Sequence, residues 1–336
     1  MRTGSAVRRR WWVLTTLCAL TFGAVIASLA FGSRAITPAE IWGALFAHTD
    51  SDNATVITSQ RAPRTWLGLV AGAALGIAGA LMQGHTRNPL ADPGLFGVTA
   101  GATFAIALAV FTADLDDPRL TVGVALVGAG IVSTAVLVLG IGAGRTGGVV
   151  LMAVLGTTIS SLLAALTTAL ILIDRQTLDT LRFWELGAID NREFDLLGPL
   201  LPLFALGAAA ALANSISLTA LGLGDDVAQS LGHHVLRSRI TGIVAITLLA
   251  GSATALCGPI SFLGLVAPHA ARLLARTDYR WIVVYSGLIG ASVLLVADTI
   301  GRVSLKTGEL EAGLVTAAIG APVLLVIARR KRVAPL

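Results

Sequence analysis

The sequence has 336 residues, of which 55% are hydrophobic and 13% are charged, with a formal net charge of +5. A soluble domain carries about a quarter charged residues, so the composition excludes an ordinary soluble protein and indicates a polytopic membrane protein. The two cysteines exclude a disulfide framework and a CxxC metal motif. The basic residues flank apolar runs rather than forming one patch, so we expect no nucleic-acid partner.

Ten apolar runs are long enough to cross the hydrocarbon core as helices. We expect these spans at residues 12–31, 65–82, 95–112, 120–141, 149–173, 196–219, 240–256, 260–275, 281–301 and 311–328. The first run is too long for a signal peptide and is interpreted as an uncleaved span. The eighth run is the weakest, because it is short and holds Pro268 and His269. The sequence predicts an all-α fold with one transmembrane domain over residues 1–336.

The distribution of charge between the loops predicts the orientation. With the N-terminus inside, 15 of the 24 Lys and Arg residues lie on the inner side, and 15 of the 19 acidic residues lie outside. Cytoplasmic loops carry an excess of Lys and Arg. An even number of spans then places both termini in the cytoplasm, and we expect a multi-pass protein of the cytoplasmic (inner) membrane.

A weak internal repeat relates the second run to the seventh. A shift of 175 residues places Arg64 on Arg239, Gly76 on Gly251, Ala80 on Ala255, Leu81 on Leu256, Leu90 on Leu265 and Pro93 on Pro268. In a ten-span topology the two runs point in opposite directions, and inverted repeats of this kind are common in transporters. The alternative is that two helices rich in Ala, Leu and Gly align by composition alone.

Motifs for chemistry are missing from the sequence. The spans hold no ionisable residue at mid-depth, which disfavours a proton or ion relay. No Walker A sequence, HExxH, GxSxG or Cys/His cluster occurs. The sequence therefore predicts no catalytic residue, no metal ligand and no cofactor in this chain. An intramembrane enzyme would need a nucleophile with its base, or metal ligands, within the spans.

Several segments resemble a known family. RAPRTWLGLVAGAALGIAGALMQGHTRNPLADPGLFGVTAGA (61–102) resembles the first signature of the FecCD family, the permease subunits of type II ABC importers for ferric siderophores, haem and vitamin B12. GLGDDVAQSLG followed by GPISFLGLVAPHAAR resembles the second signature, and LRFWELGAID, ADTIGR and AAIGAPVLL match further stretches. The resemblance covers nearly the whole chain. Within the family, the sequence is most similar to one subunit of a ferric-enterobactin (catecholate siderophore) permease pair.

The resemblance implies a fold like that of the vitamin B12 importer permease, with ten transmembrane helices and an inverted internal repeat. It also implies the partners: a second permease subunit, which we expect to be a paralogue in a heterodimer, two ATP-binding cassette ATPase subunits, an extracytoplasmic substrate-binding protein, a ferric siderophore as cargo, and membrane lipid. ATP and Mg would bind to the ATPase chains, so this chain is expected to be a transport subunit and no enzyme.

The resemblance also assigns three sites. Docking of the binding protein falls on Arg61, Arg64 and Arg302, for which snorkelling at the lipid headgroups is the alternative. Docking of the ATPase falls on the loop with Gly224, Asp225, Asp226, Ala228, Leu231 and Gly232. The pathway and its inner gate fall on Arg145, Thr146, Gly147, Thr157, Thr158, Ser160 and Ser161. The hydroxyls among these can also bond to backbone carbonyls of their own helix, which requires no function.

These observations predict a permease subunit of an ATP-driven importer for a ferric siderophore. Within the same class, a haem or vitamin B12 permease is the alternative, because the binding protein sets most of the selectivity. In another class, the alternative is a secondary transporter driven by an ion gradient. That transporter would need an ionisable residue at mid-depth and would work without an ATPase.

Overall fold

The computed structural model describes residues 3–32, 34–47, 51–142, 148–189, 194–305 and 308–329. Within these ranges the chain is helical and contains no β-strand. A helix covers each of the ten expected spans: α1 (Thr3–Ala30), α4 (Ala62–Thr86), α5 (Val98–Ala113), α6 (Pro118–Gly142), α7 (Gly148–Ile173), α9 (Leu197–Leu221), α11 (Val235–Cys257), α12 (Leu263–Ala275), α13 (Tyr279–Ser304) and α14 (Ala312–Arg329). The predicted all-α membrane fold is confirmed.

Seven of these helices are long and apolar enough to cross a membrane, and three apolar helices are shorter: Val98–Ala113, Leu263–Ala275 and Ala312–Val326. The 13 residues of α12 extend about 20 Å at 1.5 Å per residue, less than the hydrocarbon core. Its start is set by Phe262, whose φ of 66° lies in the left-handed region and interrupts the chain after α11. α12 is therefore a short helix that contains Pro268, in agreement with the short eighth run of the sequence.

Short helices join the long ones. They are α2 (Pro38–Phe46), α3 (Asp52–Val56), η1 (Ile57–Arg61), η2 (Pro93–Phe96), α8 (Arg175–Trp184), η4 (Phe194–Leu196) and α10 (Asp225–Ser230). The start of α2 is fixed by a capping box between Thr37 and Glu40. Hydrogen bonds from Thr37 and from Asn53 lower the pKa of the Glu40 carboxyl, so this carboxylate stays charged while it ties α2 to α3.

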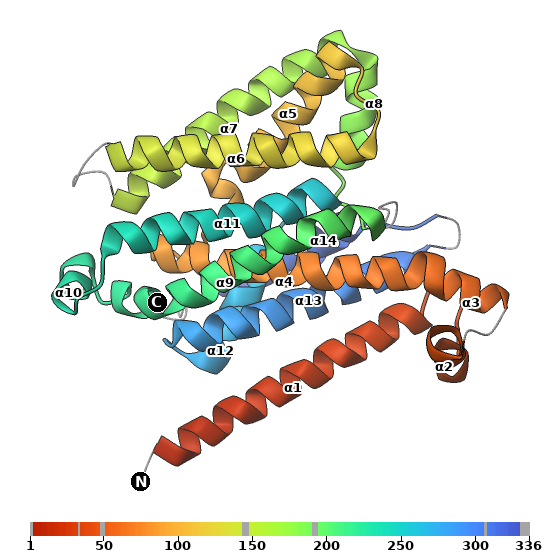
Figure 1. Ribbon diagram of the computed structural model, residues 1–336, viewed down its shortest axis with the longest axis horizontal. Helices are drawn as coiled ribbons and strands as arrows, with labels where there is room; N and C mark the ends of the chain where they lie inside the picture. Colours follow the sequence, from red (N-terminus) through yellow and green to blue (C-terminus); the bar gives the residue numbers. More distant parts are fainter. Residues whose placement is uncertain are drawn as a thin grey trace.

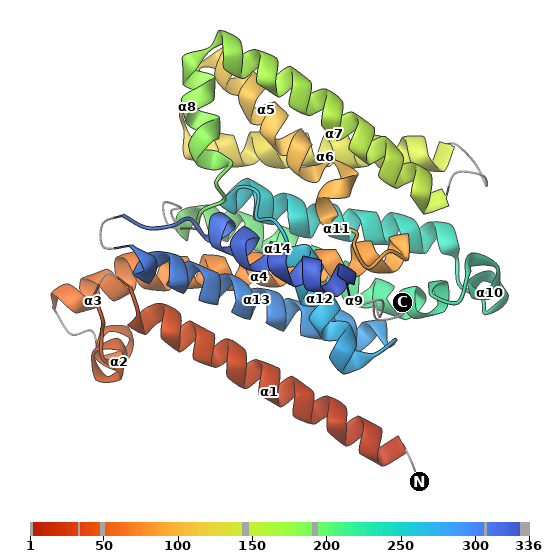
Figure 2. The same ribbon diagram turned by 180° about the vertical axis from the view of Figure 1, so that it is seen from behind.

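The long helices form a layered bundle (Figures 1 and 2). Helices α4, α9, α11, α12, α13 and α14 make up the middle, α5–α8 lie together on one side of it, and α1 lies on the opposite side. α4 and α13 pack closely against each other at glycine positions: a Cβ on Gly76 would lie 2.1 Å from the carbonyl oxygen of Ser286. Small residues allow such approach where lipid supplies no hydrophobic drive.

The two ends of the bundle differ in what they carry. α10 lies at one end, on the same side as the start of α1 and the end of α14 (Figures 1 and 2). α2 and α3 lie at the other end (Figures 1 and 2). We name these the α10 end and the α3 end. α4 runs from the α3 end to the α10 end, and α11 runs the opposite way (Figure 1), which is the relation that an inverted repeat requires.

The residue register of the repeat does not extend beyond these two helices. Pro93 is the first residue of η2 and stands outside the long helices, whereas Pro268 lies inside α12. The two prolines, which the 175-residue shift aligns, therefore occupy different structural positions.

Candidate functional site

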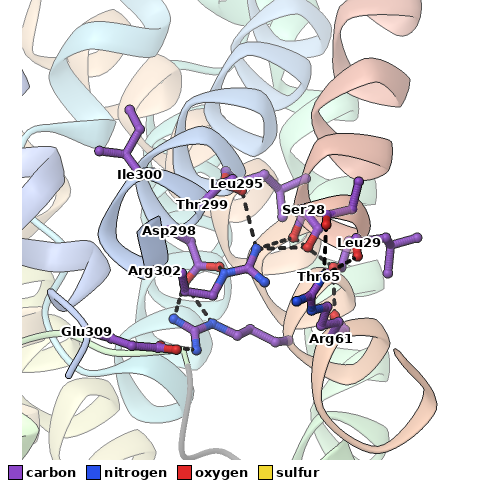
Figure 3. Close-up of polar contacts among 12 residues, drawn as sticks. Ser28, Leu29, Arg61, Thr65, Leu295, Asp298, Thr299, Ile300, Arg302 and Glu309 are labelled. Atoms are coloured by element: carbon purple, nitrogen blue, oxygen red, sulfur yellow. Dashed lines mark hydrogen bonds and ion pairs between the residues drawn. The ribbon is translucent and has the colours of Figure 1, made fainter. Parts of the chain in front are cut away.

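Arg61, Arg64 and Arg302 come together at the α3 end: Figure 3 shows Arg61 and Arg302 beside Asp298 and Glu309, the two carboxylates that pair with Arg64. Arg61 is the last residue of η1, Arg64 lies in the first turn of α4, and Arg302 lies in the last turn of α13. The close packing of α4 on α13 brings the three positions into one cluster. The sequence separates Arg64 from Arg302 by most of the chain, so only the fold makes them neighbours.

Arg61 is buried, with 5% of the residue exposed. Its Nη1 donates to the carbonyl oxygens of Leu29 at 2.8 Å and Ala30 at 2.9 Å, and its Nη2 donates to the carbonyl oxygen of Arg34. The last carbonyls of a helix have no partner within it. Arg61 therefore caps the end of α1 and fixes the chain that follows it.

Arg64 binds two carboxylates. Its Nε and Nη2 lie 2.8 Å and 2.6 Å from Oδ1 of Asp298, and its Nη1 lies 2.7 Å from Oε2 of Glu309. The side chain of Asp298 is fully buried, whereas that of Glu309 is 36% exposed. Burial of a charge is expensive unless it is paired, and Asp298 has charged partners on both sides.

Arg302 is the second partner of Asp298. Its Nε lies 3.2 Å from Oδ2 of Asp298, an ion pair without the alignment of a hydrogen bond. Its Nη2 donates to the carbonyl oxygen and the hydroxyl of Ser28, at 2.9 Å and 3.0 Å. The Ser28 hydroxyl also bonds to that of Thr65 at 2.8 Å. Arg302 thus joins α13 to α1 and α4.

The cluster holds three guanidinium groups and two carboxylates, which leaves one excess positive charge. Arg61 and Arg302 are buried and donate hydrogen bonds to backbone carbonyls and to Ser28. Within the cluster, the contact between Arg64 and Glu309 is the one open to solvent. An external carboxylate that binds here would compete with Glu309 for Nη1 of Arg64. The cluster can therefore recognise an acidic partner without a metal, and no group of three or more metal-ligating side chains occurs in the described ranges.

Asp298 and Glu309 were not predicted as site residues from the sequence. A signal existed for Asp298, because it stands four residues before Arg302 and such pairs face each other on a helix. Glu309 offered no comparable signal, because it lies in the segment after α13 and reaches Arg64 only in the folded chain.

At the α10 end, the expected coupling residues point in two directions. Ala228 is fully buried and packs into the bundle, whereas Leu231 is 61% exposed. Val227, four residues before Leu231, is also exposed, so these two side chains form an apolar ridge on the outer face of α10. Leu223 is exposed as well and lies just before the turn at Gly224 that leads into α10. Asp226 is exposed, while Asp225 forms ion pairs with side chains of the bundle.

Glycines bracket this short helix. Gly224 has φ +114° and Gly232 has φ +84°, both in the region that L side chains rarely adopt. The chain therefore enters and leaves α10 by turns that favour glycine, which accounts for both glycines of the expected motif.

The expected pathway residues lie on α7. Thr157 and Thr158 donate to the carbonyl oxygen of Val154 at 2.9 Å and 2.8 Å, and Ser161 donates to that of Thr157 at 2.9 Å. All three side chains are exposed on α7, and the buried Ser160 hydroxyl has no hydrogen-bond partner among the residues that the structure describes. The hydroxyls of Thr157, Thr158 and Ser161 thus bond within their own helix, on its exposed surface. Arg145, Thr146 and Gly147 lie outside the described residues.

Known proteins match this chain over nearly its whole length. The model of the FecCD transport family matches residues 19–330. The ferric enterobactin transport system permease protein FepD of Escherichia coli K12 is 40% identical over 329 residues, 98% of each chain. The hemin transport system permease protein HmuU of Yersinia pestis is 34% identical over 279 residues, 81% of this chain and 82% of the relative.

A solved structure shows the same fold. It is an inward-facing conformation described as a metal-chelate type ABC transporter, with a TM-score of 0.82 and 27% identity, and the match covers 95% of this chain and 99% of the other.

Proposed function

This chain belongs to the FecCD transport family, and from that membership we propose that it is the permease subunit of an ATP-binding cassette importer for a ferric siderophore of the catecholate class. The observation that carries the proposal is the 40% identity to a ferric enterobactin permease over 98% of both chains. The haem permease named above is less similar and matches a smaller share of the chain, so haem is the second candidate.

The exposed face of α7 supports a second permease subunit. Only 11% of the most apolar window of this helix is buried within the chain. α14 also presents apolar side chains on its surface, with Leu314, Ile319 and Leu325 all exposed. We propose that these two helices face a paralogous permease across the translocation pathway, with lipid around the remaining apolar surface. Thr157, Thr158 and Ser161 would then give the pathway hydroxyl patches on an apolar wall.

The apolar ridge on α10 supports an ATPase partner. Leu223, Val227 and Leu231 would be exposed to water at the membrane surface unless another protein covers them. We propose that an ATPase subunit receives this ridge, and that ATP and Mg bind in that subunit. The α10 end then lies in the cytoplasm, and the α3 end faces outward from the inner membrane.

The arginine cluster supports docking of a binding protein at the α3 end. Arg64 has one donor on an exposed carboxylate, whereas Arg61 and Arg302 are buried and hold the surrounding helices. We propose that an acidic residue of the binding protein reaches Arg64 by displacing Glu309. Arg61 and Arg302 would shape and charge the surface from below. Charged contacts of this type set register and association rate more than affinity.

The deciding experiment is reconstitution. The chain, its paralogue, the ATPase and the binding protein would be assembled in proteoliposomes and supplied with a radiolabelled ferric catecholate. We expect uptake that needs ATP, stops with a non-hydrolysable analogue and exceeds uptake of haem or vitamin B12. Uptake driven by an ion gradient without the ATPase would instead establish a secondary transporter.

A further inference from the structure

Asp225, the first residue of α10, bridges two arginines from different long helices. Its Oδ1 pairs with Nη2 of Arg87, which follows α4, and its Oδ2 lies 2.5 Å from Nη2 of Arg239 in α11. One carboxylate thus links the short helix to both α4 and α11. Its neighbour Asp226 forms no ion pair within the described parts of the chain.

The backbone has an unusual conformation on both sides of this bridge, at Arg87 and at Gly224. Arg87 is the C-cap of α4 and has φ 48° and ψ 33°, a left-handed conformation that is uncommon for a residue other than glycine. Gly224, with φ +114°, turns the chain immediately before Asp225. Two irregular backbone positions therefore converge on the same carboxylate.

The bridge is too exposed to contribute much to folding stability. The side chains of Arg87, Asp225 and Arg239 are 42%, 35% and 20% exposed. Ion pairs with this exposure contribute little net stability, because solvent screens the charges and ordering two long side chains costs entropy. Its clear consequence is geometric, because each oxygen of the carboxylate holds a different helix and α10 cannot rotate or move away without breaking one pair.

α4 connects this bridge with the arginine cluster. Its 25 residues extend about 37 Å, with Arg64 in the first turn at the α3 end and Arg87 directly after the last turn at the α10 end. Glycine packing holds α4 tightly: a Cβ on Gly79 would lie 2.0 Å from the carbonyl oxygen of Gly264. A closely packed helix transmits displacement because its neighbours cannot deform independently.

We propose that Asp225 is a positioning residue that clamps α10 to α4 and α11, so that movement imposed on α10 reaches the docking face through α4. This inference rests on the proposed function, in which α10 receives the ATPase and the α3 end receives the binding protein. It assigns Asp225 a role inside the permease, whereas Asp226 and the apolar ridge face outward.

The experiment uses the complete reconstituted transporter with its binding protein. The measured quantities are cargo taken up per ATP hydrolysed and the stimulation of ATP hydrolysis by the loaded binding protein. Asp225→Asn removes both arms of the clamp, Arg87→Gln removes the α4 arm, and Arg239→Gln removes the α11 arm. Asp225→Glu keeps the charge. Arg10→Gln is the matched control, because it breaks a 3.0 Å ion pair with Asp278 that involves neither α10 nor α4.

We expect Asp225→Asn and Arg87→Gln to lower uptake per ATP by about fivefold or more, within the usual range of coupling between sites. Asp225→Glu should restore most of it, and Arg10→Gln should match the wild type. Wild-type coupling in both Asp225→Asn and Arg87→Gln would overturn the clamp while leaving the proposed function intact. If Asp225→Asn does not assemble, Arg87→Gln alone decides, because it leaves the pair with Arg239. A wild-type complex without ATP-driven uptake would overturn the proposed function and the clamp with it.

Discussion

Arg64 and Glu309 form an ion pair of 2.7 Å in which the arginine side chain is 11% exposed and the glutamate 36% exposed. Arg64 also binds Asp298, whose side chain is fully buried; Figure 3 shows the two carboxylates, Asp298 and Glu309. The guanidinium group therefore has one partner that solvent cannot reach and one that an incoming molecule can replace. This arrangement makes Glu309 the internal competitor for any external carboxylate.

Glu309→Gln should increase the association rate constant of the binding protein by a factor of about 1.4 to 5, because an exposed pair of this type is worth about 0.2–1 kcal/mol. The rate would be measured by surface binding of the loaded binding protein to the assembled transporter. Asp52→Asn is the matched control: Asp52 is exposed at the same end and forms no ion pair in the described residues. Equal acceleration in both variants would show a general effect of charge and would contradict competition at Arg64.

Asp298→Asn should strongly destabilise the permease. The change leaves the buried guanidinium groups of Arg64 and Arg302 without their shared carboxylate, and breaking a buried pair in this way costs about 3–5 kcal/mol. Thermal unfolding of the purified chain in detergent would measure the loss. Asp195→Asn is the control, because Asp195 is 74% exposed and lies 3.8 Å from Arg119. Similar unfolding temperatures for the two variants would mean that burial of Asp298 has little energetic weight.

The burial of the cluster also changes how docking should be tested. Charge reversal of Arg61 or Arg302 would place a carboxylate against backbone carbonyls and the Ser28 hydroxyl. Such variants would lose structure before they reported on docking. Substitution of the exposed Glu309 avoids this confusion, because its removal leaves the pair between Arg64 and Asp298 in place.

Gly79→Ala should destabilise the bundle by about 1–3 kcal/mol, the usual cost of overpacking. The new Cβ would lie 2.0 Å from the oxygen and 2.6 Å from the carbon of the Gly264 carbonyl, and backbone atoms cannot move aside cheaply. Gly23→Ala in α1 is the matched control, because its Cβ would meet nothing within 4 Å. That variant should unfold at or slightly above the wild-type temperature, since alanine is the better helix former. A stable Gly79→Ala would show that α4 and α12 can separate.

The long helices were predictable from sequence because each is marked by a continuous apolar run. In lipid such a run must be helical, since only internal hydrogen bonds can satisfy its backbone polar groups. The short helices α2, α3 and α8 were not predicted, because their segments are too short or too polar to give that signal. The family motif identified the loop that contains α10, but neither motif nor spacing showed which way its side chains face. Burial of Ala228 and exposure of Leu231 depend on how α10 packs on α9.

The candidate site shows the same limit at the level of single residues. The motifs identified Arg61, Arg64 and Arg302, yet exposure and partners depend on contacts across the fold. Arg64 meets Asp298 only because glycines in α4 allow α13 to approach. Arg61 is buried because α1 ends beside it, and that is a tertiary relation that no local pattern records.

Leu231→Asp should weaken the complex between the permease and the ATPase by about tenfold or more. Leu231 is 61% exposed on the apolar ridge of α10, and burial of a leucine side chain at an interface contributes about 1.5–3 kcal/mol. The measurement is the amount of ATPase that copurifies with the permease, together with an equilibrium titration of the two. Phe46→Asp is the control, because Phe46 is 64% exposed at the α3 end and an ATPase cannot reach both ends of a membrane protein. Loss of ATPase in Phe46→Asp but retention in Leu231→Asp would reverse the proposed orientation. Equal retention of the ATPase in both variants would show that the ridge is not part of the interface, because burying an unpaired aspartate in an apolar contact must weaken binding.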